Sequence, residues 1–183
     1  MTPLISMNSL DVPINIEADC RDLGEKSDIA FHVRRAAIAA AASQGFTSGI
    51  IGVLITDDET IHQINREHLD HDYPTDVISF AYSKQSPRIE GELVASLDTA
   101  KREAAALEWS VLSELLLYVV HGSLHICGLE DSTDEQRIQM RHAEQRVLSE
   151  LGIANSIRFA PERVSSEETV GQTVTPTDSC LTC

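Results

Sequence analysis

The chain has 183 residues, which is the size of one globular domain with short additional segments. Asp and Glu outnumber Lys and Arg by 29 to 14, so the formal net charge is −15, and this excludes a protein that binds nucleic acid by bulk positive charge alone. No apolar run approaches the ~18 residues that cross a bilayer, and the N-terminus lacks the basic and apolar regions of a secretory signal. We therefore expect a cytoplasmic protein that makes no membrane contact.

Hydrophobic patterning predicts the order of the secondary-structure elements. Short alternating or β-branched runs indicate strands, and apolar residues spaced three and four apart indicate helices. Strands alternate with helices first and helices then follow one another, which predicts an α/β (α+β) domain with a small mixed sheet packed against helices. The expected strands are 12–16, 50–55, 75–82 and 91–96. The expected helices are 28–43, 57–68, 101–107, 111–128 and 133–151.

Local signals mark the ends of the later helices. Ser110 is the expected N-cap of helix 111–128, and Gly128 is the residue type that most often follows a helix C-terminus. Ser132 and Glu135 have the spacing of a capping box for the last helix. Residues 1–155 are expected to form the domain, and the Ser-, Thr-, Pro- and Glu-rich residues 156–183 are expected to be a disordered polar tail.

The four cysteines lie at positions 20, 127, 180 and 183, and no disulfide framework is expected in a cytoplasmic chain of this size. Cys127 lies beside an apolar segment and is expected in the core. Cys180 and Cys183 form a C-x-x-C pair, but a structural zinc site needs four ligands and the sequence has no second pair. A place in the polar tail is therefore favoured over a metal or redox role for this pair.

The segment 121–131 carries the strongest chemical signal. His121 and His125 are four residues apart, so a helix places both imidazoles on one face, where they can bind one metal ion. Gly128 lets the chain turn sharply, and Asp131 can then return as the third ligand. Glu130 is an alternative third ligand, or a group that orients a histidine. Two nitrogens and one carboxylate leave a position open for water, which is typical of a hydrolytic zinc site, here on a helix and the turn after it.

Two other interpretations compete with a hydrolytic metal site. A pair of structural histidines four residues apart arises often by chance, but the glycine and the acid that follow at fixed spacing favour the metal site. The spacing is also similar to that of metzincin metalloproteases, which carry a Glu general base directly after the first histidine. Gly122 occupies that position here, so a protease of this type is the weaker hypothesis.

Several blocks of the sequence together resemble the YbeY family, described as metal-dependent single-strand endoribonucleases that mature bacterial rRNA. The family signature is H-G-x-L-H-L-x-G-Y-D-H, and a second block is N-x-x-Y-R-x-x-D-x-P-T-D-V-L-S-F. The blocks follow the family order over about residues 10–155. The matching residues are His121, Gly122, Leu124, His125 and Gly128 in the signature, Asn65, Asp72, Pro74, Thr75, Asp76, Val77, Ser79 and Phe80 in the second block, Gly91, Glu92 and Leu93 in a third, and Met140, Glu144, Leu148, Leu151 and Gly152 in the closing helix.

The resemblance implies a function and a site. It implies a metal-dependent, single-strand-specific endoribonuclease acting in rRNA maturation (16S rRNA 3′-end processing) and ribosome quality control, with one zinc ion at the catalytic residues His121, His125 and Asp131. Asp131 stands where the family has a third histidine, and this carboxylate leaves Mn or Ni open as alternatives to zinc. Leu69 stands where the family has an arginine, so phosphate contact is expected from another cation such as Arg66. The implied partners are single-stranded RNA or rRNA and the ribosome or ribosomal proteins, and the oligomeric state stays open.

The mechanism has open alternatives at this point. Water and the 2′-hydroxyl of the RNA are both candidate nucleophiles. Asp76 is expected to cap or orient its neighbours rather than act as a general base, and Thr75 and Ser79 are candidates for hydrogen bonds at a cleft wall or within a strand. The alternative function is a catalytically weakened binding module for ribosome assembly, which Leu69 and the acidic charge motivate.

The distribution of charge narrows the expected mode of RNA binding. Residues from Asn155 onward hold two Arg against three Glu and one Asp, a contribution of −2, so −13 belongs to the rest of the chain. The basic doublets at 34–35 and 101–102 are the candidates for contacts with the RNA backbone, although a solvated surface is the commoner role for such pairs. We expect weak, local and salt-sensitive RNA contact, with targeting supplied by ribosomal or other protein partners.

Overall fold

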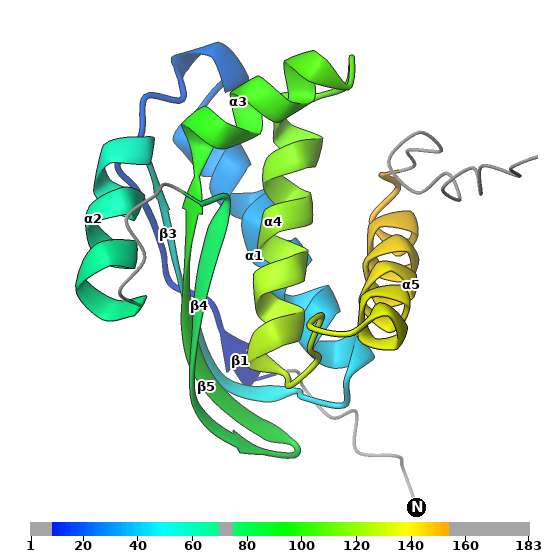
Figure 1. The fold of residues 1–183 in the computed structure, drawn as a ribbon. Coiled ribbons are helices and arrows are strands. Elements are labelled where there is room, and N and C mark those ends of the chain that lie inside the picture. The colour runs from blue at the N-terminus through cyan, green and yellow to red at the C-terminus, as the bar shows by residue number, and fades with distance from the viewer. Residues whose placement is uncertain (1–8, 70–74, 154–183) are drawn as a thin grey trace, which may run out of the picture.

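The computed structural model describes residues 9–69 and 75–153. The expected boundary at residue 155, the tail 156–183 with its C-x-x-C pair, and Asp72 and Pro74 of the second sequence block lie outside the described residues. Within them, alternating strands and helices lead into a run of helices (Figure 1), so the predicted order of elements is confirmed.

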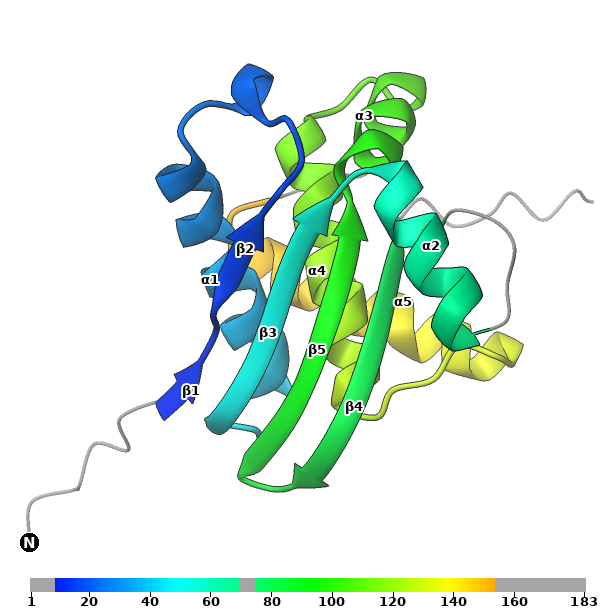
Figure 2. The same ribbon diagram turned by 90° about the vertical axis from the view of Figure 1, so that its left-hand side faces the viewer.

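A five-stranded mixed sheet forms the centre of the domain (Figure 2). The path of the sheet is β1-β3-β5-β4, and β2 also pairs with β3. All neighbours are parallel except β4 and β5, which form an antiparallel hairpin at one edge. The strands are β1 (Ser9–Asp11), β2 (Ile14–Ile16), β3 (Ser48–Thr56), β4 (Val77–Gln85) and β5 (Arg88–Ser96).

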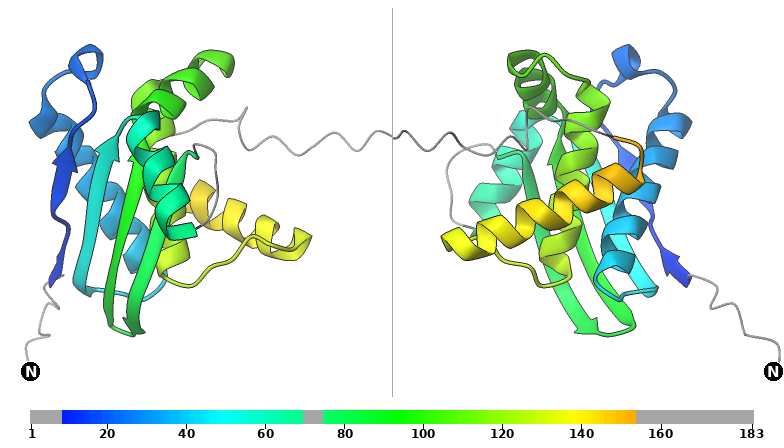
Figure 3. Two further views of the ribbon diagram at one scale, coloured as in Figure 1. Left: turned by 60° about the vertical axis from the view of Figure 1, so that its left-hand side comes forward. Right: turned by 90° about the vertical axis from the view of Figure 1, so that its right-hand side faces the viewer.

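The helices cover the two faces of the sheet unequally. α1, α4 and α5 lie on one face and α2 lies on the other (Figure 1). α5 crosses over α4 and α1 in an outer layer (Figure 3, right). The helices are α1 (Lys26–Ser43), α2 (Asp58–Leu69), α3 (Leu97–Ala106), α4 (Val111–Ile126) and α5 (Asp134–Glu150), with a short 3₁₀ turn at Arg21–Leu23.

α4 is the central helix of the core. It is buried on almost every side, since it packs on β4 and β5, on α1 and on α5. A helix that is apolar all round requires such burial. Ser110 is its N-cap, because the Ser110 hydroxyl accepts a hydrogen bond from the Ser113 N–H at 3.3 Å, as predicted.

Two glycines allow α4 to lie close against the sheet. A Cβ on Gly122 would lie 3.0 Å from Val77 Cγ2, and a Cβ on Gly91 would lie 2.6 Å from Ile126 Cγ2 and 2.8 Å from the Phe80 carbonyl oxygen. The C-terminal half of α4, which carries both signature histidines, therefore packs tightly on β4 and β5, with no room for a methyl group at Gly91 and little at Gly122.

Gly91→Ala is expected to lower the free energy of unfolding by about 2 kcal/mol, because the Phe80 carbonyl is backbone and cannot move aside cheaply. Urea denaturation measures this change. Gly52→Ala in β3 is the matched control, since a Cβ there would first meet the flexible Glu92 side chain at 3.1 Å. An equal loss of stability in both variants would show that close helix packing at Gly91 has no special role.

Two local expectations need correction. The strand expected at 12–16 is shorter, because β2 covers only Ile14–Ile16 and Pro13 before it has no N–H for the ladder. A separate strand that was not expected, β1 (Ser9–Asp11), precedes it in the same register against β3. The capping box is not Ser132 with Glu135 but Thr133 with Gln136, one residue later. The Thr133 hydroxyl accepts from the Gln136 N–H at 3.2 Å, and Gln136 Oε1 accepts from the Thr133 N–H at 3.0 Å.

Cys127 lies in the hydrophobic core, as predicted. Cys127 is buried and free, and burial raises the pKa of its thiol to about 12.

Within residues 9–69 and 75–153, no single helix has the length and apolar character to cross a membrane, although α3 and α4, bent by 120°, have them as a pair.

Asp58 ties the start of α2 to the start of α3. Its carboxylate accepts hydrogen bonds from Ser96 Oγ at 2.5 Å and Thr99 Oγ1 at 2.8 Å, and it pairs with the Arg102 guanidinium. Burial opposes the charged form, but the three hydrogen bonds and the charge of Arg102 outweigh it and lower the pKa of Asp58 below 3.8.

Asp58→Asn is expected to lower the free energy of unfolding by roughly 1–2 kcal/mol at neutral pH. Because the folded-state pKa lies below the unfolded one, the contribution of the carboxylate is present above the unfolded pKa of 3.8 and is lost as pH falls through the folded pKa. Urea denaturation of wild type and variant at neutral and strongly acidic pH measures this. A stability difference that does not shrink in acid would contradict the assignment.

Candidate metal centre

The last turn of α4 presents two imidazoles side by side. His121 and His125 lie one turn apart, with ring centroids 4.5 Å apart and rings nearly perpendicular at 86°. Their Nε2 atoms are 3.0 Å apart. Both rings are partly buried, so the predicted pairing of the two histidines on one helix face is observed.

A glycine turn after α4 brings the third group back. Gly128 has φ +99°, its N–H donates to the His125 carbonyl at 2.8 Å, and the Leu129 N–H donates to the Leu124 carbonyl at 3.0 Å. This pair of hydrogen bonds is the Schellman motif, which a left-handed residue makes possible. The reversed chain places Asp131 Oδ2 3.7 Å from His121 Nε2 and 3.6 Å from His125 Nε2.

Hydrogen bonds on the far side of each ring set the tautomers. His121 Nδ1 lies 2.6 Å from Glu144 Oε1, and His125 Nδ1 lies 2.8 Å from the Leu129 carbonyl oxygen. Both partners are acceptors, so each Nδ1–H donates and each Nε2 directs its lone pair towards Asp131. Leu129 is itself held by the Schellman turn, and the same turn therefore positions the third group and orients His125.

Three acceptor atoms thus converge with no donor between them. Their separations, 3.0, 3.6 and 3.7 Å, bracket the ~3.4 Å expected between ligands of a tetrahedral ion with bonds of about 2.1 Å. His121, His125 and Asp131 are also the one group of three metal-binding side chains found in the described part of the chain. The arrangement fits a divalent cation.

The pKa of His121 reflects the buried and acidic surroundings of its ring. Burial disfavours its charged form, but the hydrogen bond to Glu144 and the negative charges of Glu144, Asp76 and Asp131 outweigh burial and raise the pKa of His121 above 6.5. The surroundings of the ring therefore favour positive charge, which a proton or a metal ion can supply.

Glu144 is the residue of the site that spacing did not identify. It lies on α5, is 7% exposed, and entered the sequence interpretation only through the family's closing helix. Glu130, the residue proposed to orient a histidine, is exposed on the cleft wall and is not part of the converging group. Glu144 takes this orienting role instead, which the packing of α5 on α4 makes possible.

Arg137 on α5 fixes the loop that carries Asp131. Its guanidinium donates to the carbonyl oxygens of Asp131 at 3.1 Å and Ser132 at 3.0 Å, and it pairs with Asp134. Together with the glycine turn at one end of the loop, these bonds hold Asp131 from both sides.

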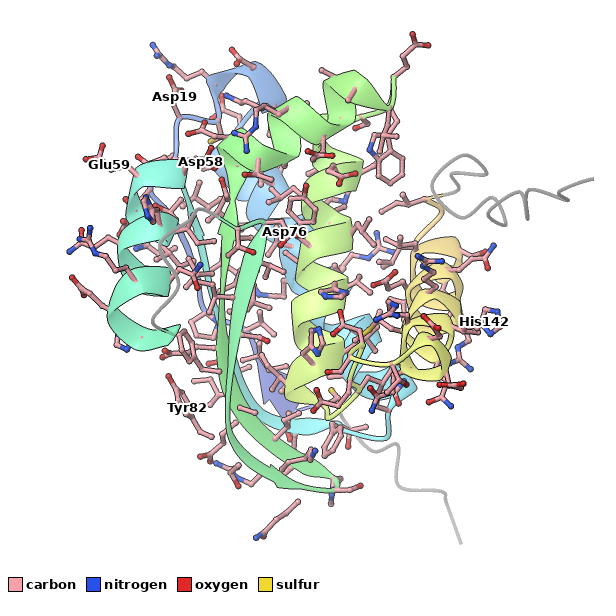
Figure 4. The ribbon with its side chains drawn as sticks, in the orientation of Figure 1. Asp19, Asp58, Glu59, Asp76, Tyr82 and His142 are labelled. Carbon is pink, nitrogen blue, oxygen red and sulfur yellow. The ribbon has the colours of Figure 1, made fainter. Side chains whose placement is uncertain are left out.

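A cleft of about 690 Å³ between β4 and the turn after α4 is lined by His121, His125 and Asp131. Asp76 lies in this cleft, on the α4 side of the upper end of β4 (Figure 4). Its Oδ1 accepts from the Val77 N–H at 2.8 Å and from Thr75 Oγ1 at 3.0 Å, which agrees with its predicted role of orienting neighbours. Thr75 and Ser79 also line the cleft.

The cations predicted to contact RNA do not line this cleft. Lys101 pairs with Asp22, and Arg102 pairs with Asp58, at the end of the molecule that Figure 4 marks with Asp19 and Asp58. Arg35 lies over the Phe31 ring, 5.6 Å from its centroid. Arg66 is exposed on α2, on the other face of the sheet. A pair of adjacent basic residues in the sequence does not show which face of a helix lies next to the site.

Comparison with known proteins gives a consistent family assignment. The model of the family "Endoribonuclease YbeY" matches residues 15–152. A relative of that name from Rhodopirellula baltica is 52% identical over 138 residues, covering 72% of this chain and 71% of the relative. One from Porphyromonas gingivalis is 43% identical over 104 residues, covering 57% of this chain and 68% of the relative. The solution structure of TM1509 from Thermotoga maritima has the same fold, with a TM-score of 0.54, 20% identity and coverage of 78% of this chain and 92% of that one.

Proposed function

Because the chain belongs to the endoribonuclease YbeY family, we propose that it hydrolyses phosphodiester bonds of single-stranded RNA with one zinc ion held by His121, His125 and Asp131. The observation that carries the proposal is the convergence of three acceptor atoms whose histidine tautomers are set by Glu144 and by a backbone carbonyl. The substrate in the cell is precursor rRNA, with a role in 16S rRNA 3′-end processing and ribosome quality control.

Each residue of the centre has a distinct task. A bound zinc ion would supply a Lewis acid that lowers the pKa of water and polarises a phosphoryl oxygen. His121 and His125 offer neutral nitrogen ligands, and Asp131 adds a carboxylate that offsets one positive charge. Glu144 keeps the His121 ring in place, and Arg137 keeps the Asp131 loop in place. Asp76 uses one oxygen to bind Val77 and Thr75, which supports a structural task for it.

The structure also disfavours the protease alternative. A metzincin-type base would have to stand at Gly122, but a Cβ there would lie 3.0 Å from Val77 Cγ2 and 3.5 Å from Leu93 Cβ. The position faces the sheet rather than the cleft. A longer side chain could not reach a substrate from there.

A partner, either the ribosome or a ribosomal protein, directs the enzyme to its rRNA substrate in this proposal. The formal charge of −15 and the acidic cleft residues Asp76, Glu130 and Asp131 oppose strong binding of long RNA by charge. A local phosphate contact and the metal ion suffice for a single cleavage event, while the partner supplies the choice of site.

A cleavage assay on purified protein tests the proposed function. A fluorescent single-stranded RNA should be cut, the same strand in a perfect duplex should be spared, a chelator should abolish cleavage, and added zinc should restore it. Product ends distinguish the nucleophiles, because attack by the 2′-hydroxyl leaves a 2′,3′-cyclic phosphate and attack by water does not. Cleavage that persists unchanged in chelator would refute a metal-dependent mechanism, and absence of cleavage with zinc present would favour a binding module.

A further inference from the structure

A β-bulge in β4 changes which side chains lie on the α4 side of the sheet. Ala81 pairs with Gly91 and Ser83 pairs with Glu90, so Tyr82 is an extra residue in the strand pairing, although its hydroxyl donates to Glu92 Oε2 on β5 at 2.8 Å. A bulge of this kind shifts the alternation of side chains by one position, and bulges often re-aim a side chain beside an active site. Tyr82 points away from α4, towards the α2 face of the sheet (Figure 4).

Before the bulge, alternate residues of β4 face α4. Val77, Ser79 and Ala81 line the cleft. On β5, Ile89 and Gly91 face the same way, since Ile89 is in the main core and Gly91 lies against Ile126. An unbroken strand would continue the series with residue 83.

After the bulge, Lys84 rather than Ser83 faces the α4 side. Lys84 pairs with Ile89, whose side chain points to that side. The end of the Lys84 side chain lies across the turn that follows α4: a Cβ on Gly128 would be 2.0 Å from Nζ, 3.1 Å from Cε and 3.3 Å from Cδ.

Lys84 is therefore a cation next to an otherwise acidic site. Asp76, Glu130 and Asp131 line the cleft. Arg137 is engaged with Asp134 and with loop carbonyls. Lys84 is exposed, and no acidic side chain in residues 9–69 and 75–153 forms an ion pair with it.

We infer that Lys84, which the bulge at Tyr82 places on the α4 side of the sheet beside the Gly128 turn, binds a phosphate oxygen of the RNA backbone next to the scissile phosphodiester. The inference rests on the proposed function, because it needs RNA in the cleft over His121, His125 and Asp131. An ammonium group suits this task as a point charge with three donors. It supplies, from β4, the phosphate contact that the resemblance had placed at position 69.

Lys84→Gln is expected to weaken binding of a short 2′-O-methyl single-stranded RNA about tenfold at low salt and to raise KM for cleavable RNA similarly, with kcat changed less than about twofold. The slope of log Kd against log salt should fall by about 0.7, the value for one phosphate contact on a single strand. Fluorescence anisotropy on the full-length, metal-loaded protein and initial-rate cleavage measure these quantities.

Three variants separate position from charge. Lys84→Arg should bind as wild type does. Lys101→Gln removes one equal charge from a lysine engaged with Asp22 and with the Asp19 carbonyl, and it should leave Kd and slope unchanged. Lys84→Gln combined with Ser83→Lys places the ammonium on the opposite face, and it should not restore binding. Metal content and melting temperature should be those of wild type in all of them.

The outcomes distinguish this inference from the proposed function. If wild type cuts RNA and Lys84→Gln has unchanged KM, Kd and slope, Lys84 has no phosphate role and the nuclease assignment stands. If wild type binds RNA without cutting it and Lys84→Gln weakens binding as expected, the phosphate contact stands and the catalytic assignment fails. Rescue by Ser83→Lys, or no RNA binding by wild type at low salt, would overturn the inference.

Discussion

His125→Ala is expected to abolish stoichiometric zinc binding and to reduce the rate of RNA cleavage by about a thousandfold or more. The substitution removes one of three convergent acceptors and leaves His121 and Asp131, 3.7 Å apart, as a two-ligand site. It also removes the ring that donates to the Leu129 carbonyl, so the turn that leads to Asp131 loses one of its stabilising hydrogen bonds. The measurement is initial-rate cleavage of a fluorescent single-stranded RNA, alongside metal content.

His142→Ala is the matched control for this variant. His142 is exposed on α5 and points away from the cleft (Figure 4), so its removal should change neither metal content nor rate. If His125→Ala kept wild-type cleavage while His142→Ala did as well, the catalytic centre would have to lie elsewhere on the molecule.

Glu144→Gln is expected to lower zinc affinity by roughly ten- to a hundredfold while the protein stays folded. The amide is nearly the same shape and can still accept from His121 Nδ1, but it lacks the negative charge that makes the ring a stronger ligand. Competition with a chromophoric chelator measures the affinity, and excess zinc should restore cleavage.

The control for Glu144→Gln lies on the same helix. Glu150 is an exposed residue at the end of α5, so Glu150→Gln removes an equal charge without touching the centre. Unchanged zinc affinity in Glu144→Gln, with a loss of stability alone, would assign Glu144 a packing role only.

The three residues of the candidate metal centre could be brought together from the sequence because the signals for them are local. Helical periodicity places His121 and His125 together, and the preference of glycine for left-handed backbone at Gly128 explains the return of Asp131. The YbeY resemblance, read from four separated blocks, is confirmed by the family match over residues 15–152. Local geometry is enough here, since all three candidate ligands lie within eleven consecutive residues.

The roles of Glu144 and Lys84 could not be predicted from the sequence, because their contacts depend on tertiary structure. Glu144 meets His121 only because α5 packs across α4, and the distance in sequence is 23 residues. Lys84 lies on the α4 side of the sheet, beside the Gly128 turn, only because the pairing of β4 with β5 contains a bulge, which no composition signal marks. The strand order of the sheet also depends on tertiary structure, since β3 lies beside β5 rather than beside β4, the next strand in the sequence.

Metal analysis of the protein as purified tests the central claim most directly. One zinc ion per chain is expected in the wild type, and less than a tenth of that, at roughly a hundredfold or greater loss of affinity, in separate His121→Ala and Asp131→Ala variants that remain folded. Zinc retained at one per chain in both variants, or a wild type that binds none when zinc is supplied, would contradict a metal centre at His121, His125 and Asp131.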